Sequence, residues 1–226
     1  MKYLLTFILF ASITFAETLA QLGVDVKVKK NDGKMEEVTI MREIDDKCEE
    51  LKFSPALVWS EGYASSKVPK PCKVTLVSTI GKISPIKIAK DVETYGELEV
   101  LKFIENMQKD KNKLFIDSRT PNWYKQRTIP GAINIPYTTF TKNNKENLDK
   151  ALKILGVSIE NNKLNFSNAK EILLFCNGAW CGQSPISIKK LIKLGYPANK
   201  IKWYRGGMHS WLSLSLTTTK ERSDLK

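Results

Sequence analysis

Two cysteines five positions apart, Cys176 and Cys181, are the residues of this chain best suited to chemistry. Cys176 directly follows the apolar run at 173–175, and the small-residue sequence Asn-Gly-Ala-Trp-Cys-Gly-Gln-Ser after it predicts a curved loop that ends at a helix start. Successive backbone N–H groups of such a loop, together with the helix N-terminus, bind an anion at the centre of the curve. A thiolate held there has a lowered pKa. We therefore predict that Cys176 is a catalytic nucleophile rather than a small apolar residue packed beneath a turn.

The second half of the sequence alternates helical and strand-like patterns. Apolar spacing predicts helices at 98–107, 147–155 and 186–194, and short apolar runs predict buried strands at 114–116, 172–175 and 201–204. Strands interleaved with helices predict an α/β fold with a mostly parallel sheet flanked by helices, whose ligands bind at the carboxyl ends of the strands. Asp117 and Cys176 both follow such ends.

The N-terminus has the pattern of a secretory signal peptide at 1–16. Lys2 precedes a compact apolar stretch at 4–10, and small residues follow up to Ala16, after which we expect cleavage. The apolar stretch is short for a bilayer span, so we expect an exported protein of the bacterial periplasm with no stable membrane span after processing. An uncleaved anchor is the alternative.

Residues 17–90 form a small, β-rich N-terminal region before a domain predicted at 91–226. Alternation at 24–28 and an apolar run at 38–41 flank a turn at 31–33 and predict a hairpin. In an oxidising compartment Cys48 and Cys72 are able to form a structural disulfide here, which leaves the other two cysteines for chemistry, although four cysteines allow three pairings.

Charge and motif content exclude several classes of partner. The formal net charge is +12, but the lysines are spread along the chain among acidic residues, with no Arg-rich run, which argues against a nucleic-acid partner. Paired Cys and His at zinc-ligand spacing and Gly-rich phosphate loops are both missing from the sequence. We therefore expect neither a metal nor a cofactor.

Four motifs in a fixed order resemble the rhodanese-like domains. They are Phe-Ile-Asp-Ser-Arg at 115–119, Ile-Pro-Gly-Ala-Ile-Asn-Ile-Pro at 129–136, the loop from Cys176, and Tyr-Arg-Gly-Gly-Met-His-Ser-Trp at 204–211. The loop is similar to that of exported single-domain rhodanese-like proteins. The resemblance implies a sulfurtransferase fold in which Cys176 carries the sulfur, and it makes His209, the single histidine, a structural or surface residue of the last motif.

The cysteine loop also departs from the common rhodanese pattern. Gly182 stands where the common loop has serine or threonine, and Ser184 comes two residues later. Gly182 also replaces the oxyanion-binding arginine of related phosphatase and arsenate-reductase loops, which argues against their chemistry. Asp117 and Arg119 either brace the floor of the site or act as a structural pair that orients a neighbouring loop. The predicted substrate-binding residues are Asn177, Gly178, Ala179, Trp180, Cys181, Gly182, Asp117 and Arg119.

We expect Cys176 to take sulfane sulfur from thiosulfate, a polysulfide or a persulfide, and to pass it from a Cys176 persulfide to a nucleophilic acceptor. The expected partners are small sulfur-containing anions or a thiol acceptor protein, and the oligomeric state is left open. Two alternatives remain. Cys181 would be a resolving thiol in a thiol-disulfide or polysulfide redox protein, or the fold would serve as a non-catalytic binding module.

Overall fold

The computed structural model describes residues 23–30, 33–41, 43, 67–70, 82–161 and 163–220. The expected signal peptide and the expected Cys48–Cys72 disulfide lie outside these residues. Among the helices in the described ranges, none is long and apolar enough to cross a membrane.

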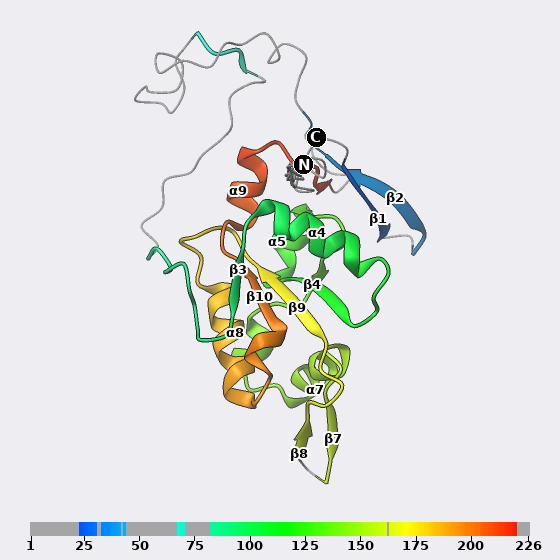
Figure 1. Ribbon diagram of the computed structural model, residues 1–226, viewed down its shortest axis with the longest axis vertical. Helices are drawn as coiled ribbons and strands as arrows, with labels where there is room; N and C mark the ends of the chain where they lie inside the picture. The colour runs from blue at the N-terminus through cyan, green and yellow to red at the C-terminus, as the bar shows by residue number, and fades with distance from the viewer. Residues whose placement is uncertain are drawn as a thin grey trace, which may run out of the picture.

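A five-stranded parallel sheet forms the centre of the structure (Figure 1). Its strands, in spatial order, are β3 (Glu93–Tyr95), β10 (Ile201–Tyr204), β9 (Glu171–Phe175), β4 (Lys113–Asp117) and β6 (Ile133–Asn134). Each neighbouring pair is parallel. Because β9 is the central strand, the residue after it, Cys176, emerges at the middle of the carboxyl edge. The predicted fold class is confirmed.

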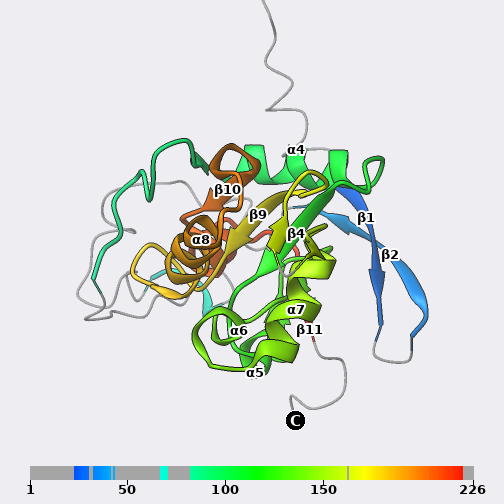
Figure 2. The same cartoon turned by 90° about the horizontal axis from the view of Figure 1, so that it is seen from below.

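Helices cover both faces of this sheet (Figure 2). On one face lie α4 (Glu97–Met107) and α9 (Gly207–Ser213), and on the other lie α7 (Lys145–Ile154) and α8 (Gln183–Leu194). Along β9, Leu173 and Phe175 join the first core cluster, whereas Ile172 and Leu174 join the second. Successive side chains of a strand point to opposite faces, so this continuous apolar run fills both cores.

The other elements are short. They are α5 (Pro121–Gln126), β5 (Arg127–Thr128), α6 (Thr138–Thr141), β7 (Ser158–Glu160), β8 (Lys163–Asn165), the 3-10 helix η2 (Ala198–Lys200) and β11 (Thr219–Lys220). The β7–β8 hairpin projects from the end of the molecule opposite α9 (Figure 1). Strand β11 pairs antiparallel with β5 and brings the C-terminal part of the described chain back to the carboxyl side of β4.

Helix α8 begins at Gln183, three residues before the start that its apolar pattern predicts. Pro185 lies in the first turn, where its missing N–H group removes no intrahelical hydrogen bond. Ser184 and Ser187 are buried on this helix, so polar residues occupy positions that the pattern would fill with apolar ones. The early start has a functional consequence, because it turns Ser184 back toward the cysteine loop.

The predicted N-terminal hairpin is present as β1 (Val24–Lys29) and β2 (Met35–Ile40), paired antiparallel. Val24, Val26 and Ile40 are buried in the same core cluster as α4. Just after β2, Met41 O accepts the Thr217 N–H at 2.9 Å, and the Glu43 N–H donates to Ser215 O at 2.7 Å. The hairpin therefore packs into the core of the α/β sheet.

Truncation of one buried hairpin residue tests this packing. Val26 is 1% exposed. We expect Val26→Ala to lower the free energy of unfolding by about 2 kcal/mol, because two methyl groups leave the core and a cavity remains. Lys27→Ala, an exposed site on the same strand, should change it by less than about 0.5 kcal/mol. Urea denaturation measures both, and equal stabilities of the two variants would contradict a shared core.

Candidate active site

The loop at 176–182 joins β9 to α8 and is held at its start by the first turn of α9. Cys176 O accepts the Met208 N–H at 3.0 Å, and Asn177 O accepts the His209 N–H at 2.8 Å. Gly207 has φ +55°, and a Cβ atom there would lie 2.3 Å from Cys176 O. Because only glycine fits so close to another backbone, the Gly-Gly-Met-His turn requires it at this position. His209 thus binds the loop through its backbone.

Cys176 and Cys181 lie against each other inside this loop. Cys176 Sγ donates to the Cys181 carbonyl oxygen at 3.4 Å, and each thiol shifts the pKa of the other. Both are free thiols, 2% and 6% exposed. The structure therefore places two buried free thiols next to each other in the loop.

Hydrogen-bond donors surround both sulfurs. The Ser184 hydroxyl donates to Cys176 Sγ at 3.1 Å, and the Ser184 backbone N–H does the same. The backbone N–H groups of Gln183 and Asn177 donate to Cys181 Sγ. Gln183 and Ser184 form the first turn of α8, where backbone N–H groups have no partner within the helix. The loop and the helix N-terminus together form a site for negative charge on sulfur.

Ser184 and Trp203 are the site residues that the sequence analysis missed. Trp203 Nε1–H donates to Ser184 Oγ at 3.1 Å, and both side chains are buried. Indole N–H is only a donor, so the Ser184 oxygen accepts from Trp203 and its own proton points to Cys176 Sγ. The sequence showed Ser184 as a departure from the common loop, but not that α8 starts early enough to direct it at the sulfur. Trp203 carries no signal beyond its place near the end of β10.

The two thiols differ in how readily they ionise. Burial raises the pKa of Cys176 well above its ordinary value, and the adjoining Cys181 raises it further. The pKa of Cys181 is lowered to about 6, first because the Cys176 thiol donates a hydrogen bond to it. Backbone N–H groups and the charge of Arg119 also favour the Cys181 thiolate, against the opposing effect of burial. The pair therefore takes its first negative charge more readily at Cys181 than at Cys176, whereas the loop sequence predicts the lowered pKa at Cys176.

Asp117 and Arg119 form a buried ion pair behind the loop. Arg119 Nη2 lies 2.7 Å from Asp117 Oδ2, and the two side chains are 3% and 0% exposed. Arg119 Nη1 donates to Asn177 Oδ1 at 3.3 Å. The guanidinium thus links the end of β4 to the loop. A direct contact of either residue with substrate stays a prediction.

The other predicted loop residues have structural contacts of their own. A Cβ atom on Gly178 would lie 3.2 Å from both Trp180 Nε1 and His209 Cβ, so the backbone of Gly178 packs closely against these side chains. Ala179 O accepts the Ser84 N–H at 2.8 Å, which brings the segment before β3 alongside the loop. Gly182 is the N-cap of α8. All predicted site residues therefore lie in the loop or in the ion pair behind it.

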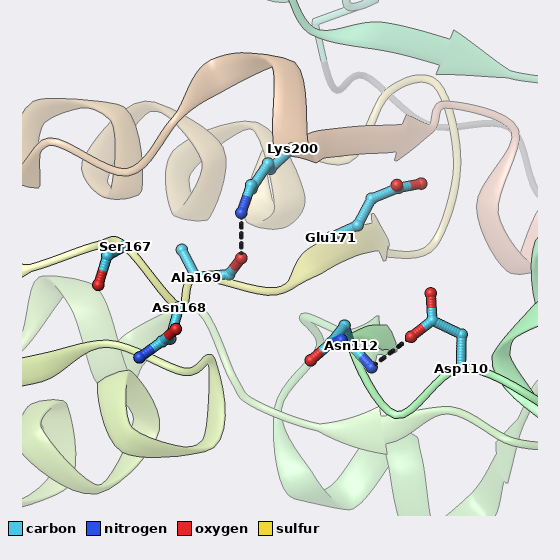
Figure 3. Close-up of a pocket in the computed structure, with 7 residues that line it drawn as sticks. All are labelled: Asp110, Asn112, Ser167, Asn168, Ala169, Glu171 and Lys200. Carbon is cyan, nitrogen blue, oxygen red and sulfur yellow. Dashed lines mark hydrogen bonds between the residues drawn. The ribbon is translucent and has the colours of Figure 1, made fainter.

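Two cavities lie elsewhere, at the amino ends of the strands. The first, of about 320 Å³, is lined by polar residues that include Asp110, Asn112 and Lys200 (Figure 3). Lys200 Nζ there donates to Ala169 O at 2.6 Å. The second shares Glu171, the first residue of β9, with the first cavity. Both are at the edge of the sheet opposite Cys176, and nothing in their lining matches the cysteine chemistry.

Within the described part of the chain, no three His, Cys, Asp or Glu side chains gather as metal ligands.

A buried cysteine at the carboxyl end of the central strand, in a loop that leads into the N-terminus of α8, is the main feature of this α/β domain. The chain belongs to the family of rhodanese-like domains, because the model of that family matches residues 100–214. The family is of the sulfurtransferase type, and many proteins with this fold are non-catalytic.

Solved structures similar to this chain include three with rhodanese-type folds. The BH2092 protein from Bacillus halodurans is 21% identical, with a TM-score of 0.39, over 60% of this chain and 82% of that protein. A polysulfide-sulfur transferase homodimer from Wolinella succinogenes is 18% identical, with a TM-score of 0.40, over 62% and 86%. A rhodanese from E. coli, determined with anions, is 21% identical, with a TM-score of 0.31, over 48% and 98%. A comparison with curated protein sequences found no match.

The pH dependence of alkylation tests the assignment of charge to Cys181. We expect the rate of Cys181 alkylation by iodoacetamide to rise with pH with a midpoint at about 6. In Cys176→Ala the thiol donor to the Cys181 thiolate is lost, so the pKa of Cys181 and the midpoint should move upward. Alkylation is quantified for the Cys181 peptide by mass spectrometry. An unchanged midpoint in Cys176→Ala would show that the two thiols do not interact.

Proposed function

We propose that the protein is a sulfurtransferase that moves sulfane sulfur through a persulfide on Cys176. The observation that carries this proposal is the Ser184 hydroxyl, which donates to Cys176 Sγ at 3.1 Å, together with the Ser184 backbone N–H, which also lowers the pKa of Cys176. These groups stabilise negative charge on a sulfur at the carboxyl edge of the sheet, where α/β proteins bind ligands. The donors proposed are thiosulfate, a polysulfide or a persulfide.

In the first step Cys176 sulfur attacks the outer sulfur of the donor. The Cys176 proton passes to the Cys181 thiolate, which belongs to the residue whose carbonyl oxygen the Cys176 thiol contacts. With thiosulfate, an S–S bond forms on Cys176, the sulfur–sulfur bond of the donor breaks and sulfite leaves. The product is an anionic Cys176 persulfide beside a neutral Cys181 thiol, so the charge of the pair is conserved and only changes place.

In the second step a nucleophile takes the outer sulfur of the persulfide. With cyanide, a carbon–sulfur bond forms, the S–S bond breaks, and thiocyanate leaves the Cys176 thiolate behind. Cys181 then returns its proton, which restores the resting pair. We propose cyanide, sulfite, small thiols or a thiol acceptor protein as acceptors, and an exported, periplasmic setting for the reaction.

Mass spectrometry of intact Cys181→Ser tests the proposal without interference from the second thiol. After incubation with thiosulfate or polysulfide, the reduced variant should gain the mass of one sulfur atom on Cys176, and cyanide should remove it. Cys176→Ser, incubated in the same way, should gain none on this loop. Peptide mapping locates the added sulfur. Absence of added sulfur on Cys176 with every donor, at neutral pH and at an alkaline pH that ionises Cys176 without the help of Cys181, would refute the transferase assignment and favour a binding module.

The contribution of Ser184 is measured by the rate of sulfur uptake. A hydrogen bond to a charged group contributes about 1.5–3 kcal/mol, so Ser184→Ala should slow uptake by about tenfold or more. Ser187→Ala is the matched control, because Ser187 is a buried serine of the same helix whose hydroxyl bonds to Gln183 O. Equal uptake rates in the two variants would show that the Ser184 hydroxyl does not act on the sulfur.

A further inference from the structure

We propose that Cys181 resolves the Cys176 persulfide, so that the same site also reduces sulfane sulfur to sulfide and closes a Cys176–Cys181 disulfide. This inference rests on the proposed function, because the Cys176 persulfide is its starting material. The persulfide then has two possible reactions. It either transfers its outer sulfur to an external acceptor or reacts with the neighbouring Cys181 thiol.

The position of Cys181 decides which sulfur of the persulfide it reaches. A thiol that attacks the outer sulfur only moves the sulfane sulfur, whereas a thiol that attacks the inner sulfur expels sulfide. Cys176 Sγ, which becomes the inner sulfur of the persulfide, lies 3.4 Å from the Cys181 carbonyl oxygen, so the two cysteines are adjacent. Movement of the Cys181 side chain then brings the two sulfurs to the length of a disulfide bond, about 2.05 Å.

The polarity of the site also favours attack on the inner sulfur. Ser184 donates two hydrogen bonds to Cys176 Sγ, which withdraw charge from that atom. Arg119 and the N–H groups of Gln183 and Asn177 stabilise negative charge on Cys181, which is the nucleophile of this step. The surroundings of Cys176 therefore suit the sulfur that is attacked, and the surroundings of Cys181 suit the thiolate that attacks it.

The step balances within the pair. The Cys176 persulfide anion and the Cys181 thiol give a Cys176–Cys181 disulfide and hydrosulfide, with the Cys181 proton leaving on the sulfide. The S–S bond to the outer sulfur breaks and a new S–S bond forms between the cysteines. Two cysteine sulfurs are oxidised and the sulfane sulfur is reduced to sulfide. An external dithiol then reduces the disulfide and returns the site to its resting state.

The products left on the protein distinguish the two reactions. The full, reduced chain is incubated with polysulfide under anaerobic conditions, without added reductant, and compared with Cys181→Ser. The wild type should lose the mass of two hydrogens, release one sulfide per chain and show a linked Cys176–Cys181 peptide. The Cys181→Ser chain should instead retain one cyanide-removable sulfur and release less than about a tenth as much sulfide, because it lacks the adjacent thiol.

Each outcome has a separate meaning. A wild type that retains cyanide-removable sulfur to the same extent as Cys181→Ser overturns the resolving role and leaves sulfur transfer intact. A Cys181→Ser chain that gains no sulfur on Cys176, even at an alkaline pH that ionises Cys176 without Cys181, overturns the proposed function and this inference with it. A disulfide that forms equally without polysulfide also overturns the inference, because the persulfide is then not its precursor. Thermal unfolding of both chains confirms that the variant is folded.

Discussion

The carboxyl edge of the sheet depends on the buried ion pair between Asp117 and Arg119. Asp117 ends β4, and its carboxylate also accepts the Thr128 hydroxyl at 2.8 Å. Arg119 reaches the Arg127 carbonyl and the Asn177 side chain, so one guanidinium joins the end of β4, the segment after α5 and the start of the cysteine loop. Loss of one partner of such a pair leaves an uncompensated buried charge and costs about 3–5 kcal/mol. The ion pair thus holds the cysteine loop in place from the side of β4.

The buried cysteine loop can hold little charge, and the chemistry proposed for it follows from this limit. Two thiols with almost no exposure share one negative charge, and burial keeps Cys176 neutral until a donor arrives. The backbone and hydroxyl donors of α8 supply the stabilisation that water provides at an exposed site. In the proposed mechanism, movement of the single charge from Cys181 to the Cys176 persulfide and back requires no other ionisable group. This arrangement explains how a loop without lysine or arginine can activate sulfur.

The sequence predicted the α/β fold and its buried strands better than the contacts within the candidate site. Apolar runs such as 172–175 are long enough to identify buried strands, and Cys176 followed one of them directly, so both the fold and the position of Cys176 at the carboxyl edge were accessible. The role of Ser184 was not, because it depends on the first turn of α8, where Pro185 and buried serines interrupt the apolar pattern. The charge on Cys181 was equally inaccessible, since it arises from contacts between residues rather than from their spacing.

The central claim is that Cys176 carries sulfane sulfur in a site built by α8 and the loop. A crystal structure of Cys181→Ser after reaction with polysulfide tests it most directly, because the added atom is seen in place. The account predicts density for one extra sulfur bonded to Cys176 Sγ, with the Ser184 hydroxyl still directed at the persulfide. An unmodified Cys176 in a chain that has taken up sulfur elsewhere would contradict it.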